Sequence, residues 1–300
     1  MSQPASARSV RYDHFGGPEV LKLLDRDVPA PGPGKVRVRV IAAGINPADS
    51  KTRRGAWAPT LPTGIGRELA GTVETAGEDS EFAPGDEVFG FAATGAVAEL
   101  VVTSDTNLAR KPAGLDWTTA GGLALVGLTA YSSTASLSLG SADTVLVSAA
   151  AGGVGVIASQ LAKRAGARVI GTASPANHEF LRSLGVEPVT YGDGLLASLR
   201  ELGPITAVLD NNGAETIEAA LALGVPVERI NTIAADAEKW GIRSVGRGAV
   251  DRAALEELAR LVVARELVVP IDSTYALDDA VAAFERLDSG HARGKVVILV

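Results

Sequence analysis

The chain has no cysteine and only three histidines, at positions 14, 178 and 291. Without cysteine there are no disulfides, no cysteine-ligated zinc or iron–sulfur cluster and no thiol nucleophile. The histidines are scattered and do not show the close spacing of a histidine metal site. The chemistry of this protein therefore has to come from other side chains or from a bound organic cofactor.

Aromatic residues make up only 4% of the 300 residues, whereas hydrophobic residues make up 46%, so the core is mainly Ala, Val and Leu. There is no Lys/Arg block, and 28 basic against 35 acidic residues give a net charge of −7. This balance argues against nucleic-acid and membrane partners. The N-terminal residues hold no long apolar run, and the most apolar segment, 145–162, is interrupted by Gly and Ser. We expect a cytoplasmic protein.

Two textures divide the chain. Up to about residue 111, short Val-rich runs alternate with Gly and Pro, and Lys35-Val-Arg-Val-Arg-Val40 has the period of a half-buried antiparallel strand. From about residue 115, strands and helices alternate, which predicts a parallel sheet with right-handed crossovers. We expect strands at 35–43, 69–75, 86–89, 98–103, 144–148, 168–172, 205–209, 229–233, 268–275 and 295–300, and helices at 118–136, 154–165, 176–184, 216–223, 251–266 and 278–287. The final segments are expected to rejoin the N-terminal β domain.

The most informative segment is Ala149-Ala-Ala-Gly-Gly-Val-Gly155, which follows a buried strand and opens a helix. Gly152 and Gly153 let a diphosphate approach the backbone, and Gly155 lets the helix pack tightly on the strand. Ala150 takes the first glycine position of the G-x-G-x-x-G pattern. The segment predicts a dinucleotide site. The alternative is a tight structural turn in an α/β protein that binds no nucleotide.

The end of the next strand indicates which dinucleotide is bound. An NAD site has an acidic residue there for the ribose hydroxyl, but Gly171-Thr-Ala-Ser174 has none before Glu179. We therefore favour NADP(H) over NAD(H). The residues expected around the adenosine phosphate are Ser174, Asn177, His178 and Tyr191. His178 and Arg182, one helical turn apart, have an ordinary solvated helix face as their alternative.

Six motifs in order carry a resemblance that covers nearly the whole chain. They are Ala42-Ala-Gly-Ile-Asn-Pro-Ala-Asp49, Gly64-Ile-Gly-Arg-Glu-Leu-Ala-Gly-Thr-Val73, Pro84-Gly-Asp-Glu-Val-Phe-Gly90, Gly127-Leu-Thr-Ala-Tyr131, Ala149–Gly155 and Arg293-Gly-Lys-Val-Val297. The chain resembles the zinc-free quinone oxidoreductase (ζ-crystallin-like) branch of the medium-chain dehydrogenase/reductase superfamily.

The resemblance implies an α/β protein with a GroES-like β domain and a doubly wound Rossmann domain, and NADPH in a cleft between them. We place the GroES-like substrate domain at 1–122 and 268–300 and the NADP-binding domain at 123–267. The branch reduces quinones or α,β-unsaturated carbonyls and is often homodimeric, and the stretch 221–233 is a candidate for pairing across a two-fold axis. An enoyl reductase that tailors a secondary metabolite and a non-catalytic NADPH-binding partner protein are the alternatives.

The resemblance also points to individual residues. Where zinc-dependent relatives carry Cys and His ligands, this chain has Asn46 and Arg67, and a guanidinium cannot ligate a metal, so no metal is expected. Thr129 is implied to lie against the nicotinamide, and the terminal Arg-Gly-Lys segment to approach the cofactor. The full set expected at the cofactor is Asn46, Thr129, Ala151, Gly152, Gly153, Val154, Gly155, Ser174, Asn177, His178, Tyr191, Asn211, Ile233, Arg293 and Lys295.

The expected reaction is hydride transfer from NADPH to a quinone or enone, with Asn46, Lys51 and Arg67 stabilising the developing oxyanion and water as the proton source. Each residue has a structural alternative. Asn46 alternatively only shapes a turn with the proline after it. Arg67, beside Glu68, is alternatively part of an interdomain ion pair, and Lys295 is alternatively a surface lysine. The glycines at 121 and 122 are expected to loosen the helix in which they lie.

Overall fold

A computed structural model describes residues 5–300, which form two compact units. The first unit runs to Leu125 and resumes at Val250, and the second runs from Val126 to Ala249. Helix α8 (Arg252–Val263) therefore belongs to the first unit, whereas the sequence-based boundaries place it in the nucleotide-binding domain. The reason is local, because Arg252 at its start donates to Glu81 and to the carbonyl of Asp105 in the first unit.

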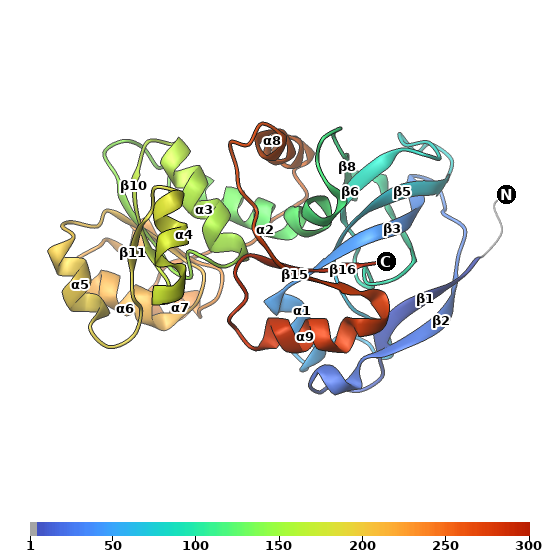
Figure 1. Cartoon of the computed structure of the whole chain (residues 1–300), viewed down its shortest axis with the longest axis horizontal. Helices are drawn as coiled ribbons and strands as arrows, with labels where there is room; N and C mark the ends of the chain where they lie inside the picture. The colour runs from blue at the N-terminus through green and yellow to red at the C-terminus, as the bar shows by residue number, and fades with distance from the viewer. Residues whose placement is uncertain (1–4) are drawn as a thin grey trace. The chain divides into compact units, whose positions relative to one another are not determined.

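The first unit is built on antiparallel sheet (Figure 1). A seven-stranded sheet has the order β15-β16-β3-β5-β6-β8, with β7 also on β3, and a three-stranded sheet has the order β2-β1-β4. The strands are β1 (Ala5–Tyr12), β2 (Lys22–Val28), β3 (Lys35–Ile45), β4 (Thr63–Gly64), β5 (Glu68–Ala76), β6 (Glu87–Phe91), β7 (Leu100–Ser104), β8 (Leu108–Arg110), β15 (Ile271–Ala276) and β16 (Lys295–Leu299). As expected, the C-terminal segment returns to this unit, with β16 antiparallel to β3.

The alternation predicted for β3 is only partly observed. Val36, Val38 and Val40 are buried as expected, but Arg37 is buried too. Its guanidinium donates to Glu74 on the neighbouring strand at 2.5 Å, and that ion pair makes burial of the charge possible. The second face of the strand is thus covered at Arg37, whereas Arg39 on the same face stays exposed.

The second unit is a six-stranded sheet in which every neighbouring pair is parallel. Its order is β11-β10-β9-β12-β13-β14. Strands β10 and β11 are therefore added on one side of β9, and β12, β13 and β14 are added on its other side. The parallel sheet confirms what the strand–helix alternation predicts, and the doubly wound topology is the one that the family resemblance implies. The strands are β9 (Thr144–Val147), β10 (Arg168–Thr172), β11 (Glu187–Val189), β12 (Ala207–Asp210), β13 (Ile230–Thr232) and β14 (Arg243–Ser244).

The helices are α1 (Pro47–Arg53), α2 (Trp117–Ala135), α3 (Gly153–Arg164), α4 (His178–Ser183), α5 (Leu195–Glu201), α6 (Ala214–Ala222), α7 (Ala237–Trp240), α8 and α9 (Ala280–Asp288). Several elements lie outside those expected from sequence, namely strands β1, β2, β4, β8, β11 and β14 and helices α1, α5 and α7. They are short or, as in β1 and β2, alternate polar and apolar residues weakly.

Helix α2 corrects one expectation, because its glycines do not loosen it. A Cβ added to Gly121 would lie 2.7 Å from the Cβ of Ala42 on β3, and one added to Gly44 would lie 2.7 Å from the carbonyl oxygen of Gly121. The glycines therefore let helix and strand approach more closely than side chains permit.

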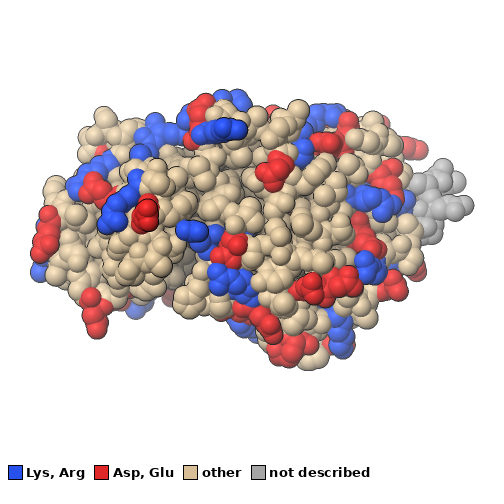
Figure 2. All heavy atoms as spheres, in the orientation of Figure 1, with Lys and Arg blue, Asp and Glu red and all other residues tan. Residues whose placement is uncertain are grey.

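Strand β13, within the stretch 221–233 expected to pair between subunits, has β12 on one side and β14 on the other. Both of its edges are occupied, so it offers no free edge for such pairing. Among residues 5–300, no helix combines the length and the hydropathy needed to cross a bilayer. On the face drawn in Figure 2, basic and acidic side chains are interspersed, in keeping with the mixed charge of the sequence.

Candidate functional site

The glycine turn lies where the strand order of the second unit reverses. Strand β9 ends at Val147, and the turn that follows leads into α3, whose N-cap is Gly152. Doubly wound sheets bind ligands at the carboxyl ends of the strands at this switch point. The first N–H groups of α3 have no partners within the helix, and the positive end of its dipole lies at the same place.

Close packing makes Gly155 necessary. A Cβ at this position would lie 2.2 Å from the carbonyl oxygen of Ala149 and 2.9 Å from the Cα of Ala150. At Gly152 a Cβ would lie 3.2 Å from the carbonyl oxygen of Ala149, which is still a tight contact but less severe than at Gly155. Gly152, Gly153 and Val154 are half-buried, so the turn presents backbone toward solvent. This geometry suits a diphosphate.

A buried carboxylate that sequence reasoning missed holds the strand ends together. Asp210, fully buried at the end of β12, accepts hydrogen bonds from the hydroxyls of Ser148 (2.8 Å) and Thr232 (2.6 Å). It also accepts from the backbone N–H groups of Asn212 (3.2 Å) and Gly213 (3.0 Å). The carboxylate thus links the ends of β9, β12 and β13 and stiffens the floor beside the glycine turn.

Asn211 sits between these strand ends with one atom unused. Its side-chain amide N–H donates to the carbonyl oxygen of Ser148 at 2.9 Å, while its Oδ1 is buried without a hydrogen-bond partner. A buried acceptor without a partner costs free energy unless a ligand or water satisfies it. A ribose hydroxyl or a carboxamide N–H of a nicotinamide nucleotide is a donor of the required kind, so the residues present fit such a cofactor.

The residues expected at the adenosine phosphate lie together after β10. Asn177 Nδ2 donates to the hydroxyl of Ser174 at 3.3 Å, and His178 Nε2 lies 3.3 Å from the carbonyl oxygen of Ala173. Tyr191 is exposed. Because no carboxylate stands between the strand end and Glu179, the prediction of NADP(H) over NAD(H) keeps its basis.

In the first unit, Asn46 is the N-cap of α1, and Asp49 closes the first turn of that helix. The Asp49 carboxylate accepts a hydrogen bond from the backbone N–H of Asn46 at 2.9 Å, as in a capping box. Pro47 occupies the first helical position, where its missing N–H has no cost. The Asn-Pro-Ala-Asp motif therefore fixes the helix start, and both polar side chains are buried.

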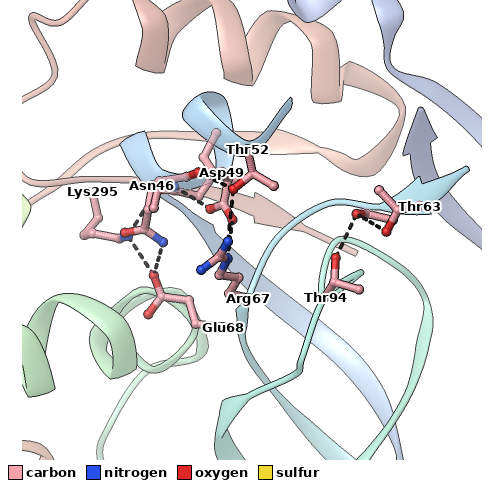
Figure 3. A network of polar contacts seen from close by, with 11 residues as sticks. Asn46, Asp49, Thr52, Thr63, Arg67, Glu68, Thr94 and Lys295 are labelled. Atoms are coloured by element: carbon pink, nitrogen blue, oxygen red, sulfur yellow. Dashed lines mark hydrogen bonds and ion pairs between the residues drawn. The ribbon is translucent and has the colours of Figure 1, made fainter. Parts of the chain in front are cut away.

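The Asn46 side chain belongs to a saturated cluster, which we define as Asn46, Glu68 and Lys295 (Figure 3). The ammonium of Lys295 donates to Glu68 Oε1 (2.7 Å), to Asn46 Oδ1 (2.6 Å) and to the carbonyl oxygen of Ile45 (3.1 Å). Asn46 Nδ2 donates to Glu68 Oε1 at 2.8 Å, and Glu68 Oε2 accepts from the backbone N–H of Leu125 at 2.8 Å. Every residue of the cluster is at most 3% exposed.

This geometry bears on the roles expected for two residues. Lys295 is no surface lysine, and its three N–H donors are all engaged inside the protein, so none is left for the cofactor contact that we expected. The buried Asn46 amide has its oxygen and one of its two N–H donors engaged in the cluster, so a single N–H is left for the expected donation to a substrate oxyanion. Lys295 is therefore better described as holding the site in place, and the role expected for Asn46 stays a prediction.

Arg67 faces away from Glu68, although the two are adjacent in sequence. Its guanidinium donates to the hydroxyl of Thr52 at 3.0 Å, and its Nε lies 3.8 Å from Asp49 Oδ1 (Figure 3). Glu68 pairs with Lys295 at 2.7 Å instead, so the two adjacent residues share no ion pair. The exposed indole of Trp57 lies over the guanidinium, 5.6 Å from it to the ring centroid.

Arg67 and Asp49 line a cavity of about 320 Å³ in the first unit. Its walls are rich in hydroxyl groups, and Lys51 is absent from them. The lining residues are Tyr12, Asp49, Thr52, Pro59, Thr60, Thr63, Gly64, Ile65, Gly66, Arg67, Ala93 and Thr94. Burial raises the pKa of Asp49 to about 6, and the nearby Arg67 and Lys295 limit the rise. The pKa of Tyr12 is also raised, mainly by burial and then by the Asp49 charge.

The other expected site residues are placed as follows. Thr129 is buried in α2 and Ile233 is half-buried just after β13, whereas Lys51 in α1 and Arg293 before β16 are exposed. Nothing in the sequence pattern singled out Tyr12, and Asp49 entered the sequence analysis only as the last residue of the Ala42–Asp49 motif. The signal for Asp49 was its place in the same motif as Asn46, one helical turn further on.

The donor set does not fit catalytic zinc. Within residues 5–300, no group of three or more His, Asp or Glu side chains is placed to hold a metal ion. The two positions that carry zinc ligands in zinc-dependent relatives hold Asn46, whose amide oxygen is bound by Lys295, and Arg67, whose guanidinium cannot ligate a metal. The neighbouring Glu68 is neutralised by Lys295. We therefore derive no step through a metal.

Comparisons with known proteins agree with this architecture. Residues 32–124 match the family described as the alcohol dehydrogenase GroES-like domain, and residues 184–298 match the family described as zinc-binding dehydrogenase. The second description contrasts with the donor set just described.

Among curated proteins, a quinone oxidoreductase of Pseudomonas aeruginosa is 37% identical over 73% of this chain and 71% of its own length. The spectinabilin polyketide synthase protein NorB of Streptomyces orinoci is 34% identical over 98% of this chain, which spans only 15% of that protein. Among solved structures, the Escherichia coli quinone oxidoreductase complexed with NADPH is 26% identical, with a TM-score of 0.88 and coverage of 99% of this chain and 100% of that chain.

Proposed function

This chain belongs to the quinone oxidoreductase branch of the medium-chain dehydrogenase/reductase superfamily, and from that premise we propose that it is a zinc-independent, NADPH-dependent reductase of quinones or α,β-unsaturated carbonyls. The observation that carries the proposal is the glycine turn at the switch point of a doubly wound parallel sheet. The NADPH bound in the Escherichia coli relative supports the same choice of cofactor.

The turn from Ala151 to Gly155 would hold the diphosphate through its N–H groups. Asn211, Thr129 and Ile233 would contact the nicotinamide half, and Ser174, Asn177, His178 and Tyr191 the adenosine phosphate. When bound, NADPH supplies the hydride. Arg67, half-exposed in its cavity, would supply positive charge where the substrate oxygen becomes anionic.

Cofactor binding tests the proposal most directly. Calorimetric titration of the wild-type protein should show binding of NADPH, with weaker binding of NADH. Gly155→Ala should lower NADPH affinity at least tenfold and destabilise the protein by about 1–3 kcal/mol, because its new Cβ would lie 2.2 Å from the Ala149 carbonyl oxygen.

A matched control is Gly140→Ala in the same unit. A Cβ at Gly140 would meet no atom within 4 Å, so binding and stability should stay as in the wild type. If neither reduced nucleotide binds the wild-type protein, the proposed function is wrong.

Turnover with 1,4-benzoquinone, 9,10-phenanthrenequinone and 2-alkenals then tests the reaction class. Oxidation of NADPH by any of these acceptors supports the enzyme, and it should persist after dialysis against a zinc chelator. Tight NADPH binding without oxidation across the panel would instead favour a non-catalytic binding partner.

An enoyl reductase is the second candidate function, and the similarity of nearly the whole chain to a polyketide synthase protein favours it. The discriminating measurement compares kcat/KM for a 2-alkenoyl thioester with kcat/KM for the quinones.

We also propose that the protein is a cytoplasmic homodimer, with light scattering as the test of its mass. Since β13 has no free edge, the edge strand β14 is the better candidate for any sheet pairing between subunits.

A further inference from the structure

The cavity of the first unit contains a hydroxyl that no residue of the described chain binds. Tyr12, at the end of β1, is only 2% exposed as a residue, and its hydroxyl makes no hydrogen bond to any residue between 5 and 300. The hydroxyl is not one of the fully buried polar atoms, so it is open to the space of the cavity and available to a ligand there. Burial, and then the Asp49 charge, raise the pKa of Tyr12, so its hydroxyl keeps its proton and can donate a hydrogen bond.

Asp49 lines the same cavity from α1. Its Oδ2 accepts the N–H of Asn46, and its Oδ1 lies 3.8 Å from Arg67 Nε, too far for a hydrogen bond. The charged groups that act on it are the cations of Arg67 and Lys295 and the carboxylate of Glu68, besides the phenol of Tyr12. Burial outweighs both cations, so the carboxyl holds its proton to about pH 6.

Arg67 supplies the third group. Only one of its N–H donors is used, on Thr52, so the guanidinium keeps donors for a ligand. Trp57 above it and Thr52 beside it hold the planar group in position. The Trp57 backbone has a positive φ of 58°, which is uncommon for a bulky residue.

We propose that Tyr12, Asp49 and Arg67 form a substrate-oxygen site in this cavity, in which Tyr12 and Arg67 donate hydrogen bonds to the carbonyl oxygen and Asp49 supplies its proton. This deepens the proposed function and rests on it. Hydride addition to the conjugated carbonyl reduces the substrate by two electrons and leaves an electron pair on its oxygen. An O–H bond then forms at that oxygen as the O–H bond of Asp49 breaks, and the carboxylate regains a proton from solvent.

The lining also limits the substrate. A volume of about 320 Å³ is at the small end of ligand pockets, and the walls contain four threonine hydroxyls. The substrate class that fits is a single-ring quinone or a short enone with further oxygen substituents, rather than a polycyclic or long-chain acceptor.

A binding experiment on the cofactor-free protein tests the site without turnover. The probe is 4-nitrophenolate, whose oxyanion resembles that of a reduced quinone and whose visible absorbance reports binding. Tyr12→Phe should weaken its binding about fivefold to tenfold, and Arg67→Gln about tenfold or more, because each removes a donor. Tyr275→Phe, a partly buried tyrosine of the same unit outside the cavity, should change nothing. Equal binding by the wild type and Tyr12→Phe overturns the assignment.

Infrared spectroscopy of the same cofactor-free protein tests the proton donor. The carbonyl stretch of a protonated carboxyl should titrate near pH 6 in the wild type and be missing from Asp49→Asn. With NADPH, kcat of the wild type should fall as pH rises through about 6, whereas Asp49→Asn should be at least tenfold slower and flat over that range. A band that survives in Asp49→Asn, or an unchanged pH profile, overturns the role of Asp49.

The two proposals fail separately. If NADPH binds and is oxidised while the phenolate and infrared measurements are negative, the oxygen site is wrong and the reductase stands. If no reduced nucleotide binds, the reductase is wrong, although the probe measurements still show whether the cavity takes an oxyanion. A purely structural role for Asp49 predicts a destabilised Asp49→Asn protein with an unaltered pH profile, and that pair of results also overturns the proposal.

Discussion

Glu68 and Arg67 are adjacent in the chain, but the polar groups around them differ in how many of their hydrogen bonds are made within the protein. Glu68 and its partners form the saturated cluster, in which three ammonium protons and both amide heteroatoms are engaged at 2.6–3.1 Å. Arg67, the adjacent residue on the other side of the chain, faces Asp49 across 3.8 Å in an open cavity. A buried cluster whose ammonium donors are all engaged holds the fold together, whereas a cavity with unused guanidinium and hydroxyl donors is suited to bind a ligand.

The contrast is also electrostatic. A buried ion pair in direct contact offsets part of the desolvation cost of its two charges. Neither of the cations that act on Asp49, Arg67 and Lys295, forms a hydrogen bond with it, so burial dominates and raises its pKa. The cavity thus contains an acid, Asp49, that is protonated at mildly acidic pH and that lowers the stability of the fold when it is ionised.

The largest expected effect comes from breaking the saturated cluster. Glu68→Gln leaves the Lys295 ammonium buried without its counter-ion, so the free energy of unfolding should fall by about 3–5 kcal/mol, measured in urea. The double variant Glu68→Gln with Lys295→Met should recover much of that loss, since no charge is then left unpaired. A loss below 1 kcal/mol for the single variant would mean that the cluster does not support the fold.

Asp49→Asn should raise the free energy of unfolding, whereas Glu68→Gln lowers it. The folded protein holds the Asp49 proton to about pH 6, and the unfolded chain only to about 3.8, so this group's stabilisation is complete below pH 3.8 and is lost as pH rises to 6. The amide keeps an acceptor for the Asn46 N–H and carries no charge. We expect a gain of about 1–3 kcal/mol at pH 7, and thermal unfolding at several pH values should show this falling slope missing from the variant.

Arg67→Gln should raise the pKa of Asp49 further, because it removes the cation that most limits the rise. The shift should be of the order of one unit, or about 1.4 kcal/mol of stability lost at pH 7. The infrared titration that follows the Asp49 carboxyl measures it. An unchanged titration would show that the two groups are not coupled across 3.8 Å.

The smallest expected effect on stability is that of Tyr12→Phe. Its hydroxyl has no partner among residues 5–300, so removing it should change the free energy of unfolding by no more than about 0.5 kcal/mol, or stabilise the protein slightly. Urea unfolding checks this. A loss of 1 kcal/mol or more would mean that the hydroxyl has a hydrogen-bond partner in the folded protein and is not free to bind a ligand.

Much of the architecture follows from local patterns. Strand–helix alternation after residue 115 predicts a parallel sheet, and the glycine turn between a buried strand and a helix predicts a nucleotide-type crossover. The structure confirms the parallel sheet, the turn and the expected strand β10. Periodicity and turn chemistry act over a few residues, and so they are readable in one dimension. The same reading missed α5 and α7, which are short and whose limits depend on packing.

The candidate site was predicted unevenly for the same reason. The turn at Gly152–Gly155 and the replacement of metal ligands at Asn46 and Arg67 are properties of residue type and order, so the sequence alone determined them. Whether Lys295 is a surface lysine or a buried partner of Glu68, 227 positions away, depends on the pairing of β16 with β3. Tertiary structure alone decided that, and with it which polar groups are used up and which stay open, because burial and distance are set by contacts between segments far apart in the chain.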